Sequence, residues 1–249
     1  MTKSIVITGG SRGIGAATAR LAGKRGWSVA VNYAGNEQAA METAAAVEAA
    51  GGKAIVVRGD VADEGDVIRI FDAAANAFGG IDGVVNNAGI IVAPPQPLAD
   101  MSAARIRKVA AVNLVGAYLV AREGVRRMAK SRGGRGGVIV NLSSAAARLG
   151  APNEYVDYAG TKGAIDTLTI GLAKEAGPEG IRVAAVRPGL IETDIHASGG
   201  SPGRAERLGA SVPLGRSGTA EEVGAAIVWL LSDEASYVNG AILEVTGGR

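Results

Sequence analysis

The chain has 249 residues, enough for one α/β domain with a large core, and its 47% hydrophobic residues with only 4% aromatics are typical of parallel strands covered by helices. The chain has no Cys, which excludes disulfides and cysteine-ligated metals. It has a single His, which makes a His-based zinc site or a Ser-His-Asp triad nearly impossible, so we expect no metal. A net charge of +2 without basic–aromatic interleaving, and no apolar run near the about 20 residues of a membrane helix, predict a cytoplasmic protein that binds neither nucleic acid nor membranes.

Short β-rich runs alternate with helical stretches along the whole chain. The expected strands are Ser4–Thr8, Ser28–Asn32, Lys53–Val57, Gly83–Asn86, Val138–Leu142, Arg182–Val186 and Ala241–Val245. The expected helices are Gly13–Lys24, Asn36–Ala50, Asp63–Ala77, Ser102–Lys130, Val156–Ala176 and Ala220–Leu231. This alternation implies right-handed βαβ crossovers and therefore a single doubly wound α/β domain over 1–249, with helices on both faces of a parallel sheet.

Four short motifs follow the expected strands. The glycine loop 9–15 follows the first strand, residues 86–89 follow the fourth, Ser143 and Ser144 follow the fifth, and the Pro-Gly pair at 188–189 follows the sixth. All four therefore lie at the carboxyl ends of strands, which is the edge where open α/β sheets bind ligands.

The glycine loop predicts the binding of a dinucleotide. Its Gly-xxx-Gly-x-Gly spacing allows a tight turn and brings a pyrophosphate to the N-terminus of the following helix. The alternative is an ordinary glycine turn between a strand and a helix. Further along the chain, Asp60 and Val61 would receive the adenine edge, and Asn86, Ala88 and Gly89 would lie against a ribose. In the loop itself we expect contacts from Gly9, Ser11, Arg12, Gly13, Ile14 and Gly15.

The end of the second strand bears on the choice between NADP and NAD. An acidic side chain there would hold a free ribose 2′-hydroxyl, but this chain continues from Asn32 without a carboxylate before Glu37. Arg12 in the glycine loop adds a cation suited to a 2′-phosphate. We therefore predict NADP(H) over NAD(H), with Asn32 among the cofactor contacts.

Tyr158 and Lys162 form the candidate catalytic pair. Residues four apart on a helix share a face, and a lysine charge beside a phenol favours the phenolate, which is a base for alcohol or carbonyl chemistry. Ser144 would donate a hydrogen bond to the substrate oxygen. Neighbours along a strand point to opposite sides, so Ser143 and Ser144 cannot serve equally, and we expect Ser144 rather than Ser143 in this role.

In this order, the motifs resemble those of the short-chain dehydrogenase/reductase family, and the resemblance covers essentially the whole chain. It implies the strand order 3-2-1-4-5-6-7 and often a homotetramer. It also implies a catalytic tetrad, which maps onto Asn113, Ser144, Tyr158 and Lys162. Asn113 would support a water that links Lys162 to solvent; the alternative is an Asn that caps or bends its helix. The implied cofactor contacts further include Tyr158, Lys162, Pro188, Gly189, Ile191 and Thr193, although a plain loop threonine is an alternative for the last.

The resemblance implies an oxidoreductase that transfers a hydride between NADP(H) and a carbonyl compound or secondary alcohol. Within the family the chain is similar to glucose 1-dehydrogenase-like oxidoreductases and, nearly as much, to 3-oxoacyl-thioester reductases. Glu179 stands where the carrier-dependent reductases often have a cation beside the one at Arg132, so a sugar or small ketone is favoured. The Gly-, Ser- and Pro-rich segment 195–216 is expected to be a substrate lid, or else a long surface connection. The alternative outside enzymes is a dinucleotide-binding sensor or scaffold without catalysis.

Overall fold

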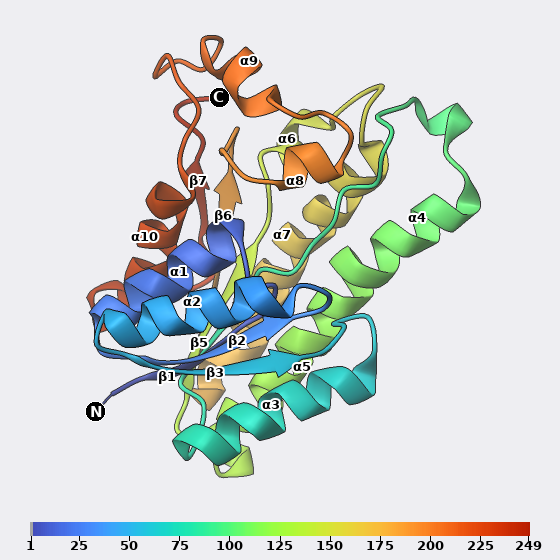
Figure 1. Ribbon diagram of the computed structural model, residues 1–249. Helices are drawn as coiled ribbons and strands as arrows, with labels where there is room; N and C mark the ends of the chain where they lie inside the picture. Colours follow the sequence, from blue (N-terminus) through green and yellow to red (C-terminus); the bar gives the residue numbers. More distant parts are fainter. Residues whose placement is uncertain (1) are drawn as a thin grey trace.

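A computed structural model describes residues 2–249, the side chain of His196 excepted, and contains one sheet of seven parallel strands (Figure 1). The strand order is β3-β2-β1-β4-β5-β6-β7, which confirms the predicted doubly wound fold. The order reverses between β1 and β4, and this reversal marks the crevice where such sheets bind ligands. The strands are β1 (Ser4–Ile7), β2 (Ser28–Tyr33), β3 (Lys53–Arg58), β4 (Gly83–Asn86), β5 (Gly137–Leu142), β6 (Ile181–Pro188) and β7 (Ile242–Val245).

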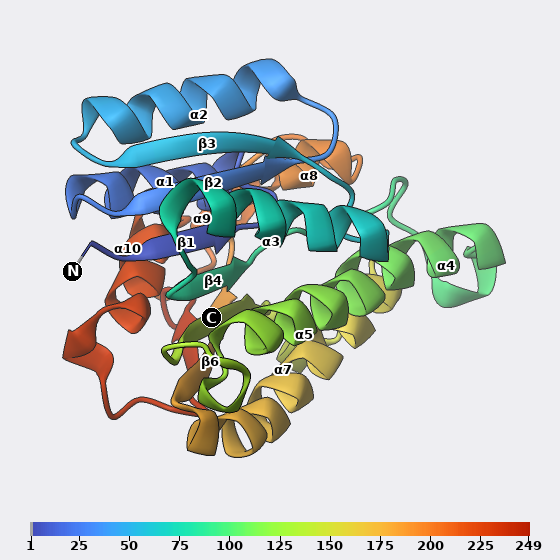
Figure 2. The ribbon, with the colours of Figure 1, turned by 90° about the horizontal axis from the view of Figure 1, so that it is seen from below.

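Helices cover both faces of the sheet. On one face α1 (Gly13–Lys24) packs against both α2 (Glu37–Ala49) and α10 (Ala220–Leu231). The opposite face is covered by α3 (Glu64–Phe78), α5 (Ala117–Met128) and α7 (Val156–Ala176), and α4 (Ala103–Ala110) projects beyond the sheet and packs on α7 (Figure 2). The shorter helices are α6 (Ala146–Leu149), α8 (Ile195–Ser198) and α9 (Arg204–Gly209). Within residues 2–249, no helix combines the length and the apolar character that crossing a membrane requires.

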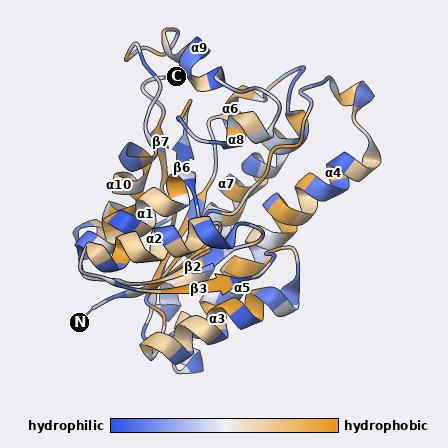
Figure 3. Ribbon diagram, in the orientation of Figure 1, coloured by the Kyte–Doolittle hydropathy of each residue, from blue (hydrophilic) through white to orange (hydrophobic). Residues whose placement is uncertain are grey.

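The alternation of side chains along each strand builds two hydrophobic cores. Ile5 and Ile7 of β1 belong to the cluster under α1, α2 and α10, whereas Val6 between them belongs to the cluster under α3, α5 and α7. Apolar residues accordingly occupy the strands and the inner sides of the helices (Figure 3). Because both faces are covered, the strands can be apolar throughout, as the composition indicates.

The predicted helix Ser102–Lys130 is interrupted. A π-helical turn, Ala111–Gly116, separates α4 from α5 and contains Asn113. The interruption has two local causes. The side chain of Asn113 bonds to a neighbouring loop, and Gly116 packs so closely on Val61 that a Cβ there would lie 2.8 Å from Val61 Cγ2. Such π-helical turns are often found at functional sites.

Candidate active site

A cavity of about 450 Å³ lies at the carboxyl ends of the strands, and its lining includes Ile195 of α8 and Arg204 of α9. Figure 1 shows both helices at this end of the sheet. Most of the motifs found in the sequence contribute to its wall. At the cofactor end it is lined by Ile14, Asn87, Gly89, Pro188, Gly189, Ile191 and Thr193. Ser144, Tyr158 and Lys162 lie in its middle, and Leu149, Ala151, Pro152, Glu154, Tyr155, Ile195, Arg204 and Arg249 line the remainder.

The glycine loop fits a pyrophosphate. Gly9 and Gly13 have φ of +61° and +53°, a conformation that other residues rarely adopt. A Cβ on Gly15 would lie 2.5 Å from the carbonyl oxygen of Gly9, so the loop can close only around glycine there. Among the described residues no side chain caps the first turn of α1, and that turn contains no acidic residue. Its free N–H groups and positive dipole end therefore face the crevice, which suits an anion.

A set of buried polar side chains holds this loop against the sheet. The hydroxyl of Thr8 accepts hydrogen bonds from the backbone N–H of Asn87 (3.0 Å) and Ala88 (3.1 Å). The amide of Asn87 donates to the carbonyl oxygens of Thr8 (2.8 Å) and Gly9 (3.0 Å). The loop is thus tied to the end of β4, which keeps the crevice in shape without a ligand.

Two asparagines predicted to contact the cofactor have other partners. Asn32 is 2% exposed; its amide accepts from Gly9 N–H (3.2 Å) and donates to the carbonyl oxygens of Val57 and Gly59. Asn86 donates to the Ala117 carbonyl oxygen (2.8 Å). The hydrogen-bonding groups of both side chains are used inside the protein, so a contact of Asn32 or Asn86 with the dinucleotide would have to come from the backbone. The side chains position the strand ends.

The other predicted cofactor residues lie along the same edge. Arg12 and Asp60 are exposed, and Ser11 is half-buried. Val61 is buried against Gly116, so its side chain serves packing and only its backbone is left to face a ligand.

The two serines after β5 both line the cavity but have different partners. Ser144 is half-buried and lines the cavity, and its hydroxyl accepts from the Ala146 backbone N–H at 3.1 Å. Ser143 is buried, and its hydroxyl donates to the backbone carbonyl of Lys162 at 3.2 Å. The geometry favours Ser144 as the residue that meets a substrate.

Lys162 lies beneath the phenol rather than at its oxygen. Its Nζ is 5.6 Å from the centroid of the Tyr158 ring and donates to the Leu142 carbonyl oxygen at 2.6 Å. Burial lowers the pKa of Lys162 to about 8, against the opposing influence of Asp166. Burial also raises the pKa of Tyr158, and the hydrogen bond from Ser144 only partly opposes this. In the chain without a cofactor, burial therefore dominates the pKa of Tyr158, and the role of the Tyr158–Lys162 pair stays a prediction.

Asn113 connects this centre to the loop after β4. Its side chain accepts from the Ile90 N–H and donates to the Ile90 carbonyl oxygen, both at 2.8 Å. A Cβ on Gly89 would lie 3.5 Å from Asn113 Oδ1 and 3.6 Å from Lys162 Nζ, so both groups approach Gly89 from the side where a Cβ would stand. The π-helical turn thus brings the buried Asn113 amide next to Gly89, which lines the cavity.

Comparison with known proteins identifies the family. The family model described as enoyl-(acyl carrier protein) reductase matches residues 9–249. The Escherichia coli oxidoreductase YgfF is 51% identical over 98% of both chains. An L-rhamnose 1-dehydrogenase (NAD(P)(+)) of Azotobacter vinelandii is 40% identical over 99% of this chain and 96% of its own. The chain belongs to the short-chain dehydrogenase/reductase family.

Solved structures of the family agree in fold. A short-chain dehydrogenase from Burkholderia cenocepacia in complex with NADP superimposes with a TM-score of 0.89 at 32% identity, covering 99% of this chain and 97% of its own. A 3-ketoacyl-(acyl-carrier-protein) reductase from Brucella melitensis complexed with NADH gives 0.90 at 31% identity, covering 99% and 98%. As a short-chain dehydrogenase/reductase, the protein is an oxidoreductase that uses a nicotinamide cofactor and acts on hydroxyl or carbonyl groups.

The end of the cavity away from the glycine loop contains residues that the sequence did not single out. Glu154 and Arg204 form a bidentate ion pair, with both N···O distances 2.6 Å. Arg249 lines the same region, and its charge contributes to the lowered pKa of Glu154, after the hydrogen bond from Arg204. No spacing rule connects these three positions, because they come from the turn before α7, from α9 and from the segment after β7. This short-chain dehydrogenase/reductase therefore has an apolar cavity with a charged outer end.

Proposed function

We propose that the protein is an NADP(H)-dependent oxidoreductase that transfers a hydride between nicotinamide and the carbonyl or secondary alcohol of a small compound, such as a sugar or a small ketone. The observation that carries this proposal is that Ser144, Tyr158 and Lys162 line one cavity, which begins at the glycine loop. A sugar is supported by the name of the rhamnose-oxidising relative.

The residues have distinct roles in this proposal. The bound nicotinamide supplies or accepts the hydride. In reduction Tyr158 gives its proton to the carbonyl oxygen, and Ser144 donates a hydrogen bond to that oxygen. The raised pKa of Tyr158 keeps the phenol protonated at neutral pH, which suits a proton donor. Lys162 would hold the nicotinamide ribose and, with Asn113, return protons to the phenol.

A 3-oxoacyl thioester on a carrier protein is the second candidate substrate, and the name of the Brucella melitensis structure supports it. Docking of an acidic carrier would need free cations near the cavity. Glu179 accepts from the Ser131 N–H at 2.8 Å, and the charge of Arg132 contributes to its lowered pKa, after those hydrogen bonds. A carboxylate beside Arg132 weakens the attraction for an acidic partner, so we favour the small compound.

A screen of sugars, small ketones and oxoacyl thioesters with both dinucleotides tests the proposal. We expect NADPH-dependent reduction, or NADP-dependent oxidation, of at least one small compound with a higher kcat/KM than any thioester. Higher kcat/KM for thioesters would establish the second candidate instead. Failure of every compound with both dinucleotides would contradict the proposal.

The preference for NADP(H) rests on Arg12. Its side chain is exposed at the start of α1, and no carboxylate stands between the end of β2 and Glu37. Hydrogen bonds to a charged group are worth about 1.5–3 kcal/mol, so we expect Arg12→Ser to lower kcat/KM for NADPH by about 10- to 100-fold. The value for NADH should hardly change. Arg20→Ser is the control, because Arg20 pairs with Glu221 at the other end of α1. Equal losses with both dinucleotides would refute this role.

We also propose a homotetramer. Exposed apolar side chains on α4, α5 and α7 support an interface, namely Ile106, Tyr118 and Ile170.

A further inference from the structure

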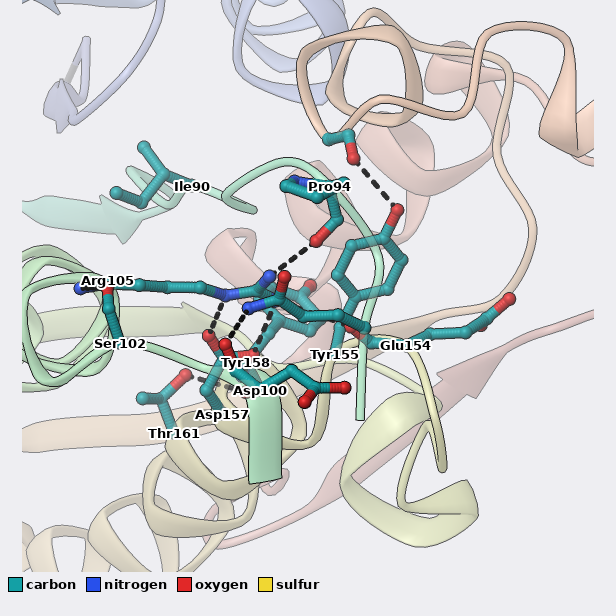
Figure 4. Close-up of polar contacts among 12 residues, drawn as sticks. Ile90, Pro94, Asp100, Ser102, Arg105, Glu154, Tyr155, Asp157, Tyr158 and Thr161 are labelled. Carbon is teal, nitrogen blue, oxygen red and sulfur yellow. Dashed lines mark hydrogen bonds and ion pairs between the residues drawn. The ribbon is translucent and has the colours of Figure 1, made fainter. Parts of the chain in front are cut away.

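A buried arginine on α4 lies beside the catalytic centre and has no role in the reaction described above. The side chain of Arg105 is 5% exposed, and that of its partner Asp157 is 3% exposed. Arg105 Nε donates to Asp157 Oδ2 at 2.8 Å, and Nη2 lies 3.3 Å from Oδ1 (Figure 4). Arg105 Nη1 donates to the carbonyl oxygen of Pro94 at 2.5 Å, and Nη2 lies 3.3 Å from that of Glu154. One guanidinium thus joins α4, the loop after β4 and the start of α7.

Asp157 links Arg105 to the backbone of Tyr158. The two residues are neighbours in the first turn of α7, and Asp157 Oδ1 accepts from the Tyr158 backbone N–H at 2.9 Å. The N–H groups of a first turn have no partner within the helix. The carboxylate therefore fixes the backbone of the residue that carries the phenol, and Arg105 in turn fixes the carboxylate.

The same arginine faces the segment 195–216 across an aromatic ring. The Tyr155 ring has the guanidinium carbon of Arg105 6.0 Å from its centroid and that of Arg204, on α9, at 5.9 Å. The Tyr155 hydroxyl donates to the Gly199 carbonyl oxygen at 3.0 Å. Together with the ion pair of Glu154 and Arg204, these contacts hold the segment 195–216 on the turn that precedes α7.

Stability alone does not account for a buried ion pair at this place. Desolvation of two charges costs several kcal/mol per ion, and apolar residues of similar volume are often equally stabilising or better. The guanidinium contributes orientation, because its N–H donors lie in one plane and hold several acceptors in fixed positions at once. The other charges that face this cluster are Lys162 on α7, the pair of Glu154 and Arg204, and Arg249. Because Asp157 is paired with Arg105, the negative charge of its carboxylate is balanced where it lies beside Tyr158.

We propose that Arg105 is a positioning residue for Tyr158, acting through Asp157 and the Pro94 carbonyl to hold the phenol in register with the loop after β4. This inference rests on the proposed function of Tyr158 as the proton donor. A displaced proton donor slows the chemical step without changing the cofactor site, so loss of Arg105 should lower kcat and leave cofactor binding unchanged.

The decisive variant is Arg105→Met combined with Asp157→Asn, which leaves no unpaired buried charge and keeps similar volumes. We expect its kcat to fall by about 10- to 100-fold, while the dissociation constant for NADPH is unchanged. In the protein without ligands, amide hydrogen exchange of residues 90–97 and 151–158 should be faster than in the wild type.

The single variants separate charge from geometry. Arg105→Met leaves the Asp157 carboxylate alone beside Tyr158, which disfavours the phenolate, so the rise of the oxidation rate with pH should move to higher pH. The double variant should return this profile to that of the wild type while its rate stays low. Arg105→Lys keeps the positive charge but lacks the planar set of N–H donors, so we expect a kcat between those of the wild type and Arg105→Met.

The matched control is Arg127→Met. Arg127 pairs with Glu123 and Asp72 near the end of α5, at the opposite edge of the sheet, so the melting temperature should fall and kcat should not. A double variant with wild-type kcat, pH profile and exchange rates would overturn the inference. If the wild type itself reduced no carbonyl compound, the proposed function would fail, and the exchange rates would still decide whether Arg105 fixes this turn.

Discussion

Replacement of Tyr158 by Phe is expected to abolish turnover and to spare cofactor binding. The substitution removes only the hydroxyl, so the ring still fills its place over Lys162. Proton transfer by a positioned group contributes about 10²- to 10⁴-fold, and Ser144 cannot replace it because a serine hydroxyl is a far weaker acid than a phenol. Steady-state kcat with the best substrate from the screen, and a fluorescence titration with NADPH, measure the two effects separately.

Tyr237→Phe is the matched control for this experiment. Tyr237 is fully exposed and remote from the cavity lining, so the loss of its hydroxyl should change neither kcat nor the dissociation constant. Undiminished turnover by the Tyr158 variant would remove the central residue of the proposal. A loss of NADPH binding equal to the loss of kcat would mean that the hydroxyl serves the cofactor rather than the chemistry.

The architecture could be predicted from the sequence because each signal was local. The strands are short apolar runs, the helices between them are long, and parallel strands place every following motif at one edge. Alternation likewise predicted that Ser143 and Ser144 cannot serve equally, and the structure gives their hydroxyls different partners. These inferences needed no knowledge of which distant residues meet.

The residues that the sequence did not identify depend on contacts between distant segments. Asn87 braces the glycine loop, whereas its neighbour Asn86 bonds to α5, and an Asn-Asn pair alone does not distinguish them. Tyr155 is followed four residues later by Ala159, so the pairing rule that selects Tyr158 passes it over. In the structure its ring is approached by Arg105 from α4 and by Arg204 from α9. Each of these arginines is about 50 positions away from Tyr155 in the sequence.

The pKa of the Tyr158 phenol is another property that residue spacing alone does not predict. A Tyr and a Lys four positions apart share a helix face, but the spacing does not say which atom the ammonium meets. In the folded chain Lys162 is bonded to the Leu142 carbonyl oxygen, and burial acts on both side chains. Desolvation disfavours the charged form of each, so it raises the pKa of Tyr158 and lowers that of Lys162.

Replacement of Lys162 by Met is expected to remove activity and, at neutral pH, to stabilise the fold. The side chain is 5% exposed, and its pKa is lowered to about 8, whereas an unfolded lysine titrates near 10.4. Below pH 8 the folded protein therefore holds a charge that its surroundings disfavour, at a cost on the order of 3 kcal/mol. The cost shrinks as the pH rises from about 8 to about 10, because the folded protein loses this proton first.

The Met variant avoids that cost but also loses the hydrogen bond to Leu142, worth about 1 kcal/mol. We expect its melting temperature to rise by roughly 4–8 °C at pH 7 and this gain to fade towards pH 10. Thermal unfolding between pH 6 and pH 10, together with kcat, provides the measurement. Lys174→Met, on the exposed side of the same helix, should show neither effect. A Met variant less stable than the wild type at pH 7 would show that the buried ammonium contributes to folding. A stabilised variant without turnover would instead mean that this lysine is maintained for catalysis at the expense of stability.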